Sequence, residues 1–340
     1  MLLAGDLGGT KTLLGVFDDS PGRPLPRVVR EFATLDYDDL APMVAEFLRD
    51  AWIEAAAVTA ATIGVAGPVK HRAAWLTNVP WRIDASELQH RLGLGHVELV
   101  NDVEAMAWAV PTLRNDEIAV LQAGIDDPEG NALLMTAGTG LGHCFLHRVG
   151  PLLVPMGSEG GHADFAARTD REVALARFLS ERVGRVDVEA VVSGRGLGRI
   201  ADFTHDGPCP LAPAGLELAD YPAHVSGAAM EDRCRSCAEA FDIFLEAFGS
   251  VVGSVAILAV ARGGVFLGGG IPPKILDALA DGRFIRAFRA KPPMEALLSD
   301  IPVKVILDAR AGLSGAAIHA SSRKSQPLPI PDPRSPNPRS

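Results

Sequence analysis

The sequence predicts an α/β protein built from two similar halves, on the strength of three observations. Strand-like apolar segments alternate with amphipathic, helix-like segments from residue 2 to residue 113. The order of apolar strand, glycine turn and second strand at 2–17 recurs at 132–147. Glycine-rich turns follow three of the apolar strands. Because such a repeat indicates a duplicated fold, we expect a ligand cleft between the two halves.

The elements of the first half follow from hydrophobic periodicity and turn residues. Three strands are expected between residues 2 and 32, interrupted by "GGTK" and "DDSPGRPLP". The other expected elements are a helix within 37–51, a strand within 55–67, a helix at 84–93, a strand at 96–102 and a helix at 103–113.

The second half begins with the repeated strand, turn and strand, and continues with helices at 170–183, 187–203 and 228–260. A strand and turn at 263–271, a strand at 301–308 and a helix at 311–322 complete the chain. We therefore expect a small domain of residues 1–112 plus 303–323 and a large domain of residues 113–302. Residues 324–340 are rich in proline and are expected to form a disordered, dispensable tail.

The composition excludes several classes of protein. Acidic residues outnumber basic ones by 42 to 32, which gives a net charge of −10. No run of Lys or Arg offers a footprint for nucleic acid. The N-terminus has no basic leader, and the longest apolar stretch, residues 251–261, is far shorter than the ~20 residues that span a bilayer. We expect a cytoplasmic protein that binds neither nucleic acid nor a membrane.

The four cysteines are too few for a disulfide framework at this length. Cys234 and Cys237 form the pair "CRSC" inside a long helical pattern, without a second such pair or a paired histidine motif nearby. We therefore expect both thiols to pack within the protein and to bind no structural zinc.

The three glycine turns read "DLGGTK", "AGTGLG" and "LGGGIP". Backbone N–H groups in such turns point at anions, and the absent Cβ lets phosphate oxygens approach. None of the turns matches the dinucleotide fingerprint or the P-loop. The interpretation that remains is a nucleotide held between turns of the two halves.

Asp6 precedes the first of these turns, so its carboxylate is expected beside a bound phosphate. The two negative charges repel each other unless a cation lies between them. Mg²⁺ typically binds one or two carboxylates together with phosphate oxygens and water. The alternative is that Asp6 caps its own turn; we favour the metal-facing role.

Asn101 and Asp102 follow the apolar strand "HVELV", and side chains at the carboxyl ends of such strands face the ligand. Two interpretations of Asp102 stay open: it accepts a proton from a substrate hydroxyl, or it caps the following helix. Further polar candidates are Asn78, Glu159, His162 and Glu189. Amides, carboxylates and an imidazole together suit the recognition of a ring of hydroxyl groups.

Taken in order, several segments resemble the bacterial glucokinase family: "GDLGGTK", "TNVPW", "LVNDVEAMA", "TAGTGLG", "SEGGHADF", "VEAVVSGRGL" and "GGVFLGGGI". The resemblance runs from Leu2 to Ala320. It implies a two-lobed, hexokinase-like and actin-like fold related to ribonuclease H. It also implies a homodimeric phosphotransferase that uses ATP and Mg²⁺ to phosphorylate the 6-hydroxyl of glucose at the entry to glycolysis.

The resemblance further implies a role for each candidate residue. Asp102 is implied as the general base, and the side chains implied to hold the other sugar hydroxyls are Asn78, Asn101, Glu159, His162 and Glu189. The residues implied to contact the nucleotide are Asp6, Gly8, Gly9, Thr10 and Lys11 in the first turn, Gly138 and Thr139 in the second, and Gly268 and Gly269 on the adenosine side. Asp6 is the expected metal ligand.

Lys11 departs from the family's pattern, in which Asn often follows "GGT", and matches a related group of repressors, open-reading-frame proteins and sugar kinases. That group carries a cysteine-rich zinc motif after its catalytic region, whereas this chain continues "AARTDREVALARF" without a cysteine. Two alternatives stay open: a kinase for mannose, fructose or an amino sugar, and a non-catalytic sugar sensor on the same fold. The presence of Asp102 favours catalysis.

Overall fold

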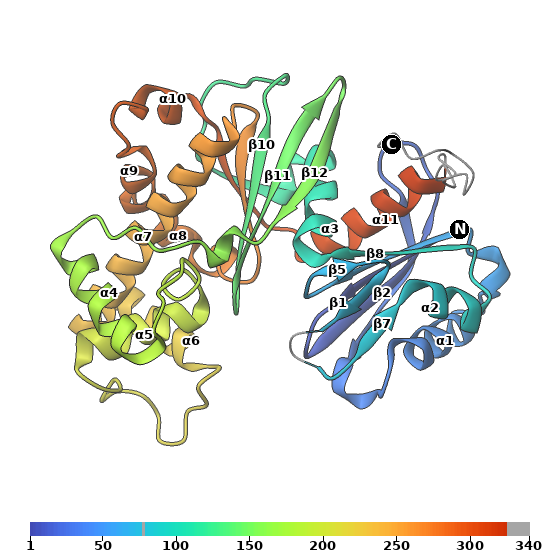
Figure 1. The fold of residues 1–340 in the computed structure, drawn as a ribbon, viewed down its shortest axis with the longest axis horizontal. Helices are drawn as coiled ribbons and strands as arrows, with labels where there is room; N and C mark the ends of the chain where they lie inside the picture. Colours follow the sequence, from blue (N-terminus) through green and yellow to red (C-terminus); the bar gives the residue numbers. More distant parts are fainter. Residues whose placement is uncertain (77–78, 325–340) are drawn as a thin grey trace, which may run out of the picture. The chain divides into compact units, whose positions relative to one another are not determined.

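The computed structural model describes residues 1–76 and 79–324 (Figure 1). Asn78 and residues 325–340 of the expected tail lie outside the described residues. The chain divides into two compact units, the first formed by Met1–Ala109 with the chain from Gly312 onward, and the second by Val110–Ala311.

The first unit is a five-stranded sheet with helices on both faces (Figure 1). In sheet order its strands are β3 (Leu25–Ala33), β2 (Lys11–Asp18), β1 (Leu2–Leu7), β4 (Ala60–Val65) and β8 (His96–Asn101). A small second sheet contains β5 (Val69–Lys70), β6 (Ala73–Trp75) and β7 (Arg82–Asp84). The helices are α1 (Leu40–Asp50), α2 (Ala85–Leu92), α3 (Asp102–Ala109) and α11 (Ala311–Lys324).

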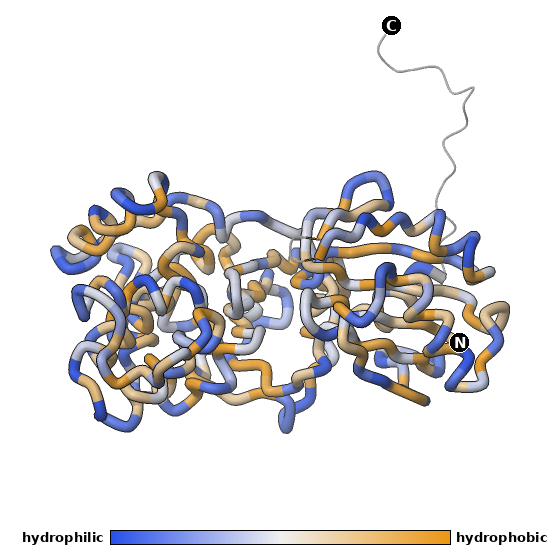
Figure 2. The backbone as a smooth tube through the Cα atoms, turned by 90° about the horizontal axis from the view of Figure 1, so that it is seen from below, coloured by the Kyte–Doolittle hydropathy of each residue, from blue (hydrophilic) through white to orange (hydrophobic). Residues whose placement is uncertain are grey.

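Alternate residues of β1 contribute to two separate cores, because successive side chains of a strand point to opposite faces. Leu3 packs with buried residues of α1 and α2, whereas Leu2 packs with residues of α3 and α11. Figure 2, in which the backbone is coloured by hydropathy, shows hydrophobic stretches alternating with hydrophilic ones along the chain. Gly315 lets α11 cross α3 closely, since a Cβ there would lie 1.8 Å from the carbonyl oxygen of Ala105.

The second unit is a six-stranded sheet with most of its helices packed around one long helix. In sheet order its strands are β12 (Leu152–Ser158), β11 (Leu141–Val149), β10 (Ala132–Ala137), β13 (Gly264–Gly268), β14 (Val303–Ile306) and β9 (Ile118–Gln122). The helices are α4 (Asp170–Val183), α5 (Gly194–His205), α6 (Tyr221–Met230), α7 (Arg235–Ala259), α8 (Leu276–Ala280), α9 (Arg283–Arg289) and α10 (Glu295–Asp300).

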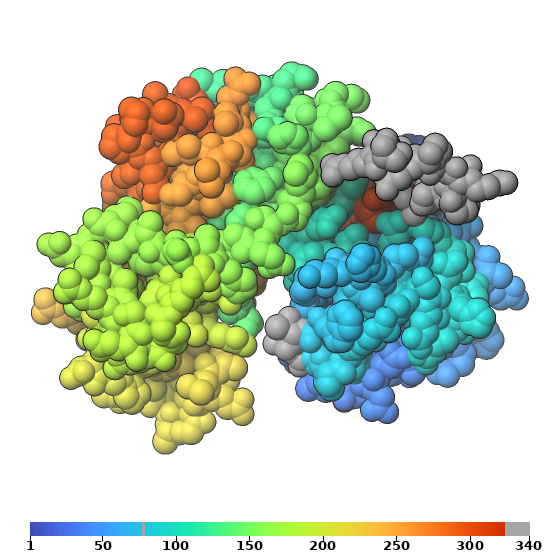
Figure 3. Space-filling view, in the orientation of Figure 1, coloured from blue at the N-terminus to red at the C-terminus, as the bar shows by residue number. Residues whose placement is uncertain are grey.

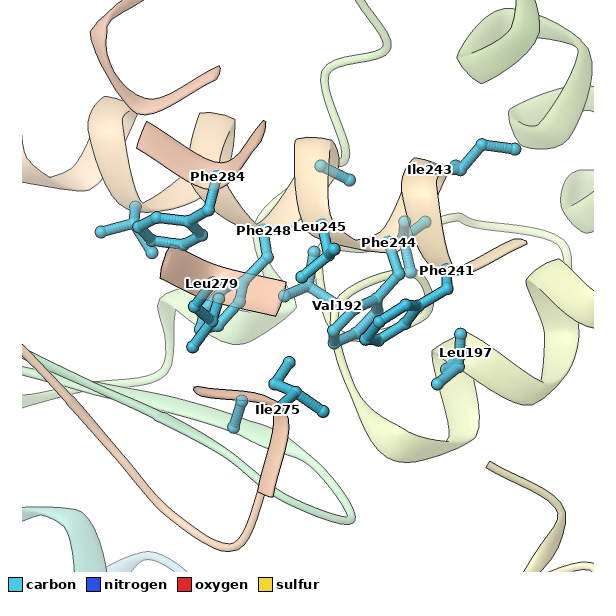
Figure 4. Packing of buried hydrophobic residues seen from close by; sticks show 14 of the residues in the cluster. Val192, Leu197, Phe241, Ile243, Phe244, Leu245, Phe248, Ile275, Leu279 and Phe284 are labelled. Atoms are coloured by element: carbon cyan, nitrogen blue, oxygen red, sulfur yellow. The ribbon is translucent and has the colours of Figure 1, made fainter. Parts of the chain in front are cut away.

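Helix α7 is the centre of this unit's hydrophobic core. Figure 4 shows Phe241, Phe244 and Phe248 along α7, beside residues from neighbouring elements such as Leu279. By length and composition alone α7 could cross a membrane. Many of its side chains are buried. Helix α9 also crosses it closely at Gly249, where a Cβ would lie 2.2 Å from a backbone oxygen. These contacts explain the apolar character of α7 as that of a core helix.

The two units repeat one strand arrangement, as the sequence predicts. The order β3-β2-β1-β4-β8 in the first unit matches β12-β11-β10-β13-β14 in the second. In both units the hairpin strands pair antiparallel and the next two strands add in parallel. The register agrees in detail, because Asp6 pairs with Gly64 across β1 and β4, and Thr136 pairs with Gly268 across β10 and β13. The duplicated α/β fold is thus confirmed.

The structure corrects three expectations about the elements. The strand β14 pairs with β13 and β9, so residues 303–311 belong to the second unit rather than to the small domain. The expected helix at 228–260 is two helices, α6 and α7, because Asp232 takes a left-handed φ of 51° between them. The expected helix at 187–203 begins only at Gly194, where Ser193 caps it.

Candidate active site

The first glycine turn closes the β1–β2 hairpin. The Gly8 N–H donates to the Lys11 carbonyl at 3.0 Å, and a Cβ on Gly8 would lie 2.9 Å from that oxygen. The buried Thr34 holds the turn from behind: its hydroxyl donates to the Gly8 carbonyl at 2.8 Å and its N–H to the Thr10 carbonyl at 2.9 Å. Thr10 itself is exposed.

Asp6 lies near the carboxyl end of β1 and faces the start of α11. Gly312 makes room for it, because a Cβ there would lie 2.8 Å from Asp6 Oδ2. Burial raises the pKa of Asp6 to about 6, and the negative charge of Asp102 adds to the shift. Two mutually repelling, partly buried carboxylates form the kind of donor set that a divalent cation stabilises.

Asn101 and Asp102 lie where β8 passes into α3. The Asn101 side-chain oxygen accepts the N–H groups of Val103 at 2.9 Å and Glu104 at 3.4 Å, which is the pattern of an N-cap. Its amide nitrogen donates to the Gly67 carbonyl at 3.3 Å. Asp102 is the first residue of α3, and its Oδ1 also accepts the Val103 N–H, at 2.9 Å. Asn101 therefore supplies the main cap.

The second glycine turn, between β10 and β11, is held by Glu189. The Glu189 Oε2 accepts the Leu141 N–H at 2.9 Å. A Cβ on Gly140 would lie 2.6 Å from that carboxylate oxygen, whereas a Cβ on Gly138 would meet none of the described residues within 4 Å. Gly138 also accepts a hydrogen bond at 2.8 Å from the N–H of Gly194, at the beginning of α5. The turn and the α5 N-terminus thus lie together.

The third glycine turn follows β13 and packs against the second. Gly269 takes a φ of +87°, and a Cβ there would lie 2.5 Å from the Ala137 carbonyl. The same carbonyl accepts the Ile271 N–H at 3.0 Å. Gly268 is buried in β13 beside Thr136. Backbone groups of two glycine turns and of one helix N-terminus therefore gather in one part of the second unit.

The "SEGGHADF" segment lies beside this group. Glu159 precedes the short turn of helix Gly160–His162, and the Glu189 N–H donates to the Gly161 carbonyl at 2.9 Å. The exposed His162 bonds through Nδ1 to Asp187 Oδ2 at 2.9 Å. That hydrogen bond raises the pKa of His162, with smaller contributions from Glu189 and Glu159. The structure thus brings Glu159, His162 and Glu189 together.

Lys11 has a partner that its sequence context does not suggest. Its Nζ donates to Glu31 Oε1 at 2.8 Å, and both side chains are exposed. Contact of Lys11 with a phosphate stays a prediction, as does nucleotide binding by Gly9 and Thr139.

Three residues that support the site escape the sequence analysis. Thr34 lies between two apolar residues, and no sequence pattern indicates its role in holding the turn. Gly312 stands just inside the last helix, which gives a weak hint of close packing. Asp187 precedes Glu189 by two residues in "RVDVEAVV", and this spacing could have indicated that Asp187 lies near the site.

The duplicated sheets with glycine turns after β1, β10 and β13 define a protein of the actin-like ATPase fold. A family model described as glucokinase matches residues 3–323. Curated glucokinases from Nostoc punctiforme and Synechocystis sp. are 36% and 35% identical to the chain; each alignment covers 94% of this chain, with 99% and 97% of those proteins. The chain belongs to the glucokinase family, a family of sugar kinases.

Solved structures agree with this assignment. A glucokinase from an Antarctic psychrotroph has a TM-score of 0.81 and 28% identity, covering 94% of this chain and 98% of that one. A ROK family glucokinase from Streptomyces griseus, solved with glucose and AMPPNP, has a TM-score of 0.64 at 22% identity, covering 94% and 99%, and is similar in fold.

Proposed function

We propose that this glucokinase transfers the γ-phosphoryl group of ATP to the 6-hydroxyl of D-glucose with Asp102 as the general base. The observation that carries the proposal is the capping of α3 by Asn101, because the Asn101 side-chain oxygen accepts two N–H groups at the helix start, whereas Asp102 accepts one of the two. A carboxylate at the first position of a helix is favoured in its ionised form by the helix dipole. We assign the acceptance of the hydroxyl proton to the Asp102 carboxylate.

The nucleotide is assigned to the glycine turns. The S. griseus relative was solved with AMPPNP and glucose, which supports ATP as the donor here. The space beside the Gly138 Cα is open, since a Cβ there would meet none of the described residues within 4 Å. The beginning of α5 lies beside it, where the Gly194 N–H donates to the Gly138 carbonyl. Exposed N–H groups and a helix N-terminus attract phosphate oxygens. We assign the phosphates to the turns at Gly8–Thr10 and Gly138–Thr139, and the adenosine side to Gly268 and Gly269.

Asp6 is assigned to the Mg²⁺ that accompanies ATP. Its buried carboxylate, with a pKa raised to about 6 and the charge of Asp102 nearby, fits a divalent cation. Bound there, Mg²⁺ neutralises charge on the transferring phosphoryl group. Asp6 itself holds its negative charge at the end of β1, and Gly312 keeps the space beside it open.

The sugar hydroxyls are assigned to the polar side chains that the resemblance implies. In the second unit Glu159, Glu189 and His162 offer two carboxylates and an imidazole around one short turn. The Nδ1 of His162 is used by Asp187, so we assign Nε2 to a sugar hydroxyl. Asn101 and Asn78 complete the predicted set. Positioning of the attacking oxygen and charge neutralisation account for most of the catalysis in phosphoryl transfer.

The reaction product, glucose 6-phosphate, places the enzyme at the entry to glycolysis. Because ATP and glycolysis are cytoplasmic, we place the enzyme there as well. A homodimer stays a prediction.

An ADP-release assay with ATP, Mg²⁺ and a panel of hexoses tests the proposal. We expect the highest kcat/KM with D-glucose, and lower values with mannose, fructose and glucosamine. A clear preference for one of the other sugars would assign a different substrate. Absence of ADP release with every hexose, in protein that glucose still protects against thermal unfolding, would point to a sugar sensor.

A further inference from the structure

Three cysteines and one histidine meet at one point of the second unit. His205 is the last residue of α5, Cys209 lies in the loop that follows, Cys234 precedes α7 and Cys237 lies in its first turn. One ligand atom from each lies within 4.8 Å of the others. Cys209 and Cys237 are buried, while His205 and Cys234 are partly exposed. Of these four residues, the sequence pattern indicates only the "CRSC" pair.

The distances in this cluster are those of a tetrahedral metal site. A tetrahedral zinc ion with Zn–S bonds of about 2.3 Å and Zn–N bonds of about 2.0–2.1 Å places its sulfurs about 3.8 Å apart and sulfur and nitrogen about 3.6 Å apart. Cys209 Sγ lies 3.9 Å from Cys234 Sγ and 3.6 Å from Cys237 Sγ. His205 Nε2 lies 3.3 Å and 3.6 Å from the sulfurs of Cys234 and Cys237.

The same distances exclude a disulfide between these partners as the cluster stands. An S–S bond is about 2.05 Å long, and all four cysteines are free thiols. Three thiols and an imidazole around one point are also an unusual packing arrangement, since a core is normally filled by hydrocarbon side chains. The cluster therefore has the composition and spacing of a ligand set.

The histidine is oriented as a metal ligand. His205 Nδ1 lies 2.8 Å from the Ala201 carbonyl, so Nδ1 carries the proton and donates it there. This hydrogen bond leaves the lone pair of Nε2 directed at the sulfurs. Metal-binding histidines almost always donate their second N–H to a carbonyl or carboxylate in this way.

The chain around Cys209 has few buried side chains. From Asp206 to Asp220, Cys209 is the single buried residue. The segment from here to α6, drawn in yellow in Figure 3, lies at the surface of the second unit. Its backbone is also tied by the Tyr221 hydroxyl, which accepts the Cys209 N–H at 2.9 Å. A metal at Cys209 would join this segment to the end of α5 and the start of α7.

We propose that His205, Cys209, Cys234 and Cys237 bind one structural zinc ion. Three thiolates and one imidazole fill the four positions of zinc and leave none for substrate, so the ion is structural. Binding releases the three thiol protons to solvent and changes no oxidation state. The soft sulfur ligands also separate this site from Mg²⁺, which prefers oxygen. This proposal replaces the expectation that Cys234 and Cys237 bind no zinc.

The test is the metal content of tag-free protein produced in zinc-supplemented medium and washed with a weak chelator. We expect about one zinc ion per chain in the wild type. Cys237→Ser and His205→Ala should each reduce this to a small fraction of one. Cys144→Ala is the matched control, because Cys144 is a buried cysteine on β11 outside the cluster, and it should keep the full amount.

A second measurement uses only wild-type protein, so it tests the proposal even if the variants fail to fold. Wild-type protein stripped of metal and refolded with Co²⁺ should show the intense ligand-field bands of tetrahedral cobalt, and added Zn²⁺ should displace them. Removing zinc with a strong chelator should lower the unfolding midpoint, and adding zinc back should restore it. The proposal is overturned if wild-type protein contains no stoichiometric zinc or shows no such cobalt bands. It is also overturned if Cys237→Ser contains as much zinc as the wild type.

Discussion

The hairpin β1–β2 and the hairpin β10–β11 occupy equivalent places in the two units, yet they differ in charge. Asp6 and Thr136 hold the same register position, each beside a glycine of the neighbouring parallel strand. The first is a carboxylate whose pKa is raised to about 6, whereas the second is a neutral hydroxyl. The two hairpins therefore share a backbone arrangement but carry different functional groups at the same position.

The supports behind the two turns differ in the opposite sense. The Thr34 hydroxyl holds the first turn, and the Glu189 carboxylate holds the second. Each unit thus places one carboxylate near its turn, but from a different element. On the proposed assignment both turns contact the phosphates, while Asp6 serves the metal beside the first turn and Glu189 serves the sugar beside the second. The following variants test that division.

Of these variants, Asp6→Asn should have the largest effect on turnover. Loss of the metal ligand removes several kcal/mol of charge stabilisation, so kcat should fall by about a hundredfold or more. The same change should stabilise the metal-free protein at pH 7 by on the order of 1–3 kcal/mol, because it removes a buried charge. Thermal unfolding without Mg²⁺ and steady-state kinetics with Mg²⁺ measure the two effects.

The pH dependence of stability follows from the raised pKa of Asp6. The folded pKa of about 6 lies above the value of 3.8 for an unperturbed Asp. The penalty for ionising Asp6 in the folded state therefore grows between about pH 4 and pH 6 and stays constant above. The difference in unfolding midpoint between Asp6→Asn and wild type should grow over that window. A difference independent of pH would contradict the buried charge.

Gly140→Ala and Gly138→Ala form a matched pair in the second turn. A Cβ on Gly140 would strike the Glu189 carboxylate, whereas one on Gly138 would meet none of the described atoms within 4 Å. Gly140→Ala should weaken the Glu189 hydrogen bond at a cost of about 1.5–3 kcal/mol and raise the KM for glucose. Gly138→Ala should fold normally and raise the KM for ATP. Equal kinetic effects would refute the assignment.

His162→Ala and Glu159→Ala should weaken sugar binding by about 1–3 kcal/mol each and leave nucleotide affinity similar. Glucose and nucleotide titrations monitored by thermal shift measure both affinities. Unchanged glucose affinity in both variants would show that this segment does not contact the sugar.

Asp187→Asn tests the partner of His162. Since the hydrogen bond to Asp187 raises the pKa of His162, the variant should bring that pKa back toward its ordinary value. The ion pair stabilises the fold fully below the ordinary histidine pKa and loses this effect as pH rises through the raised value. NMR titration of the His162 ring gives the pKa directly, and an unchanged value would argue against the pair.

Lys11→Met and Glu31→Gln should have the smallest effects. An exposed ion pair typically contributes about 0.2–1 kcal/mol, so both variants should unfold at nearly the wild-type midpoint. If Lys11 also contacts phosphate, Lys11→Met alone should raise the KM for ATP. Equal KM values in the two variants would restrict Lys11 to the ion pair.

Much of the fold could be predicted because its signals are local. The apolar runs and glycine turns at 2–17 and 132–147 predicted two hairpins, and the structure confirms both with matching strand order. Membership of β14 in the second sheet could not be predicted, since a strand's own residues do not specify its neighbours. The break near Asp232 depends on a single left-handed residue within an otherwise helical pattern.

The candidate site was predictable in part for the same reason. Asp102, Glu159 and Glu189 stand in recognisable motifs, whereas the cap function of Asn101 depends on hydrogen-bond geometry that spacing alone leaves open. The cluster around Cys237 was missed because Cys209 and His205 are separated from it by the whole of α6. Contacts between residues so distant in sequence follow from packing, which a local pattern does not report.

The central claim is that Asn101 caps α3 while Asp102 takes the proton, and one paired measurement tests it most directly. The kcat and the glucose-induced shift in unfolding midpoint are measured for Asp102→Asn and Asn101→Ala. We predict that Asp102→Asn lowers kcat by ~10²–10⁴ but stays folded and still responds to glucose. Asn101→Ala should instead lose about 1 kcal/mol of stability with a smaller loss of kcat. Near-wild-type turnover in Asp102→Asn would contradict the account.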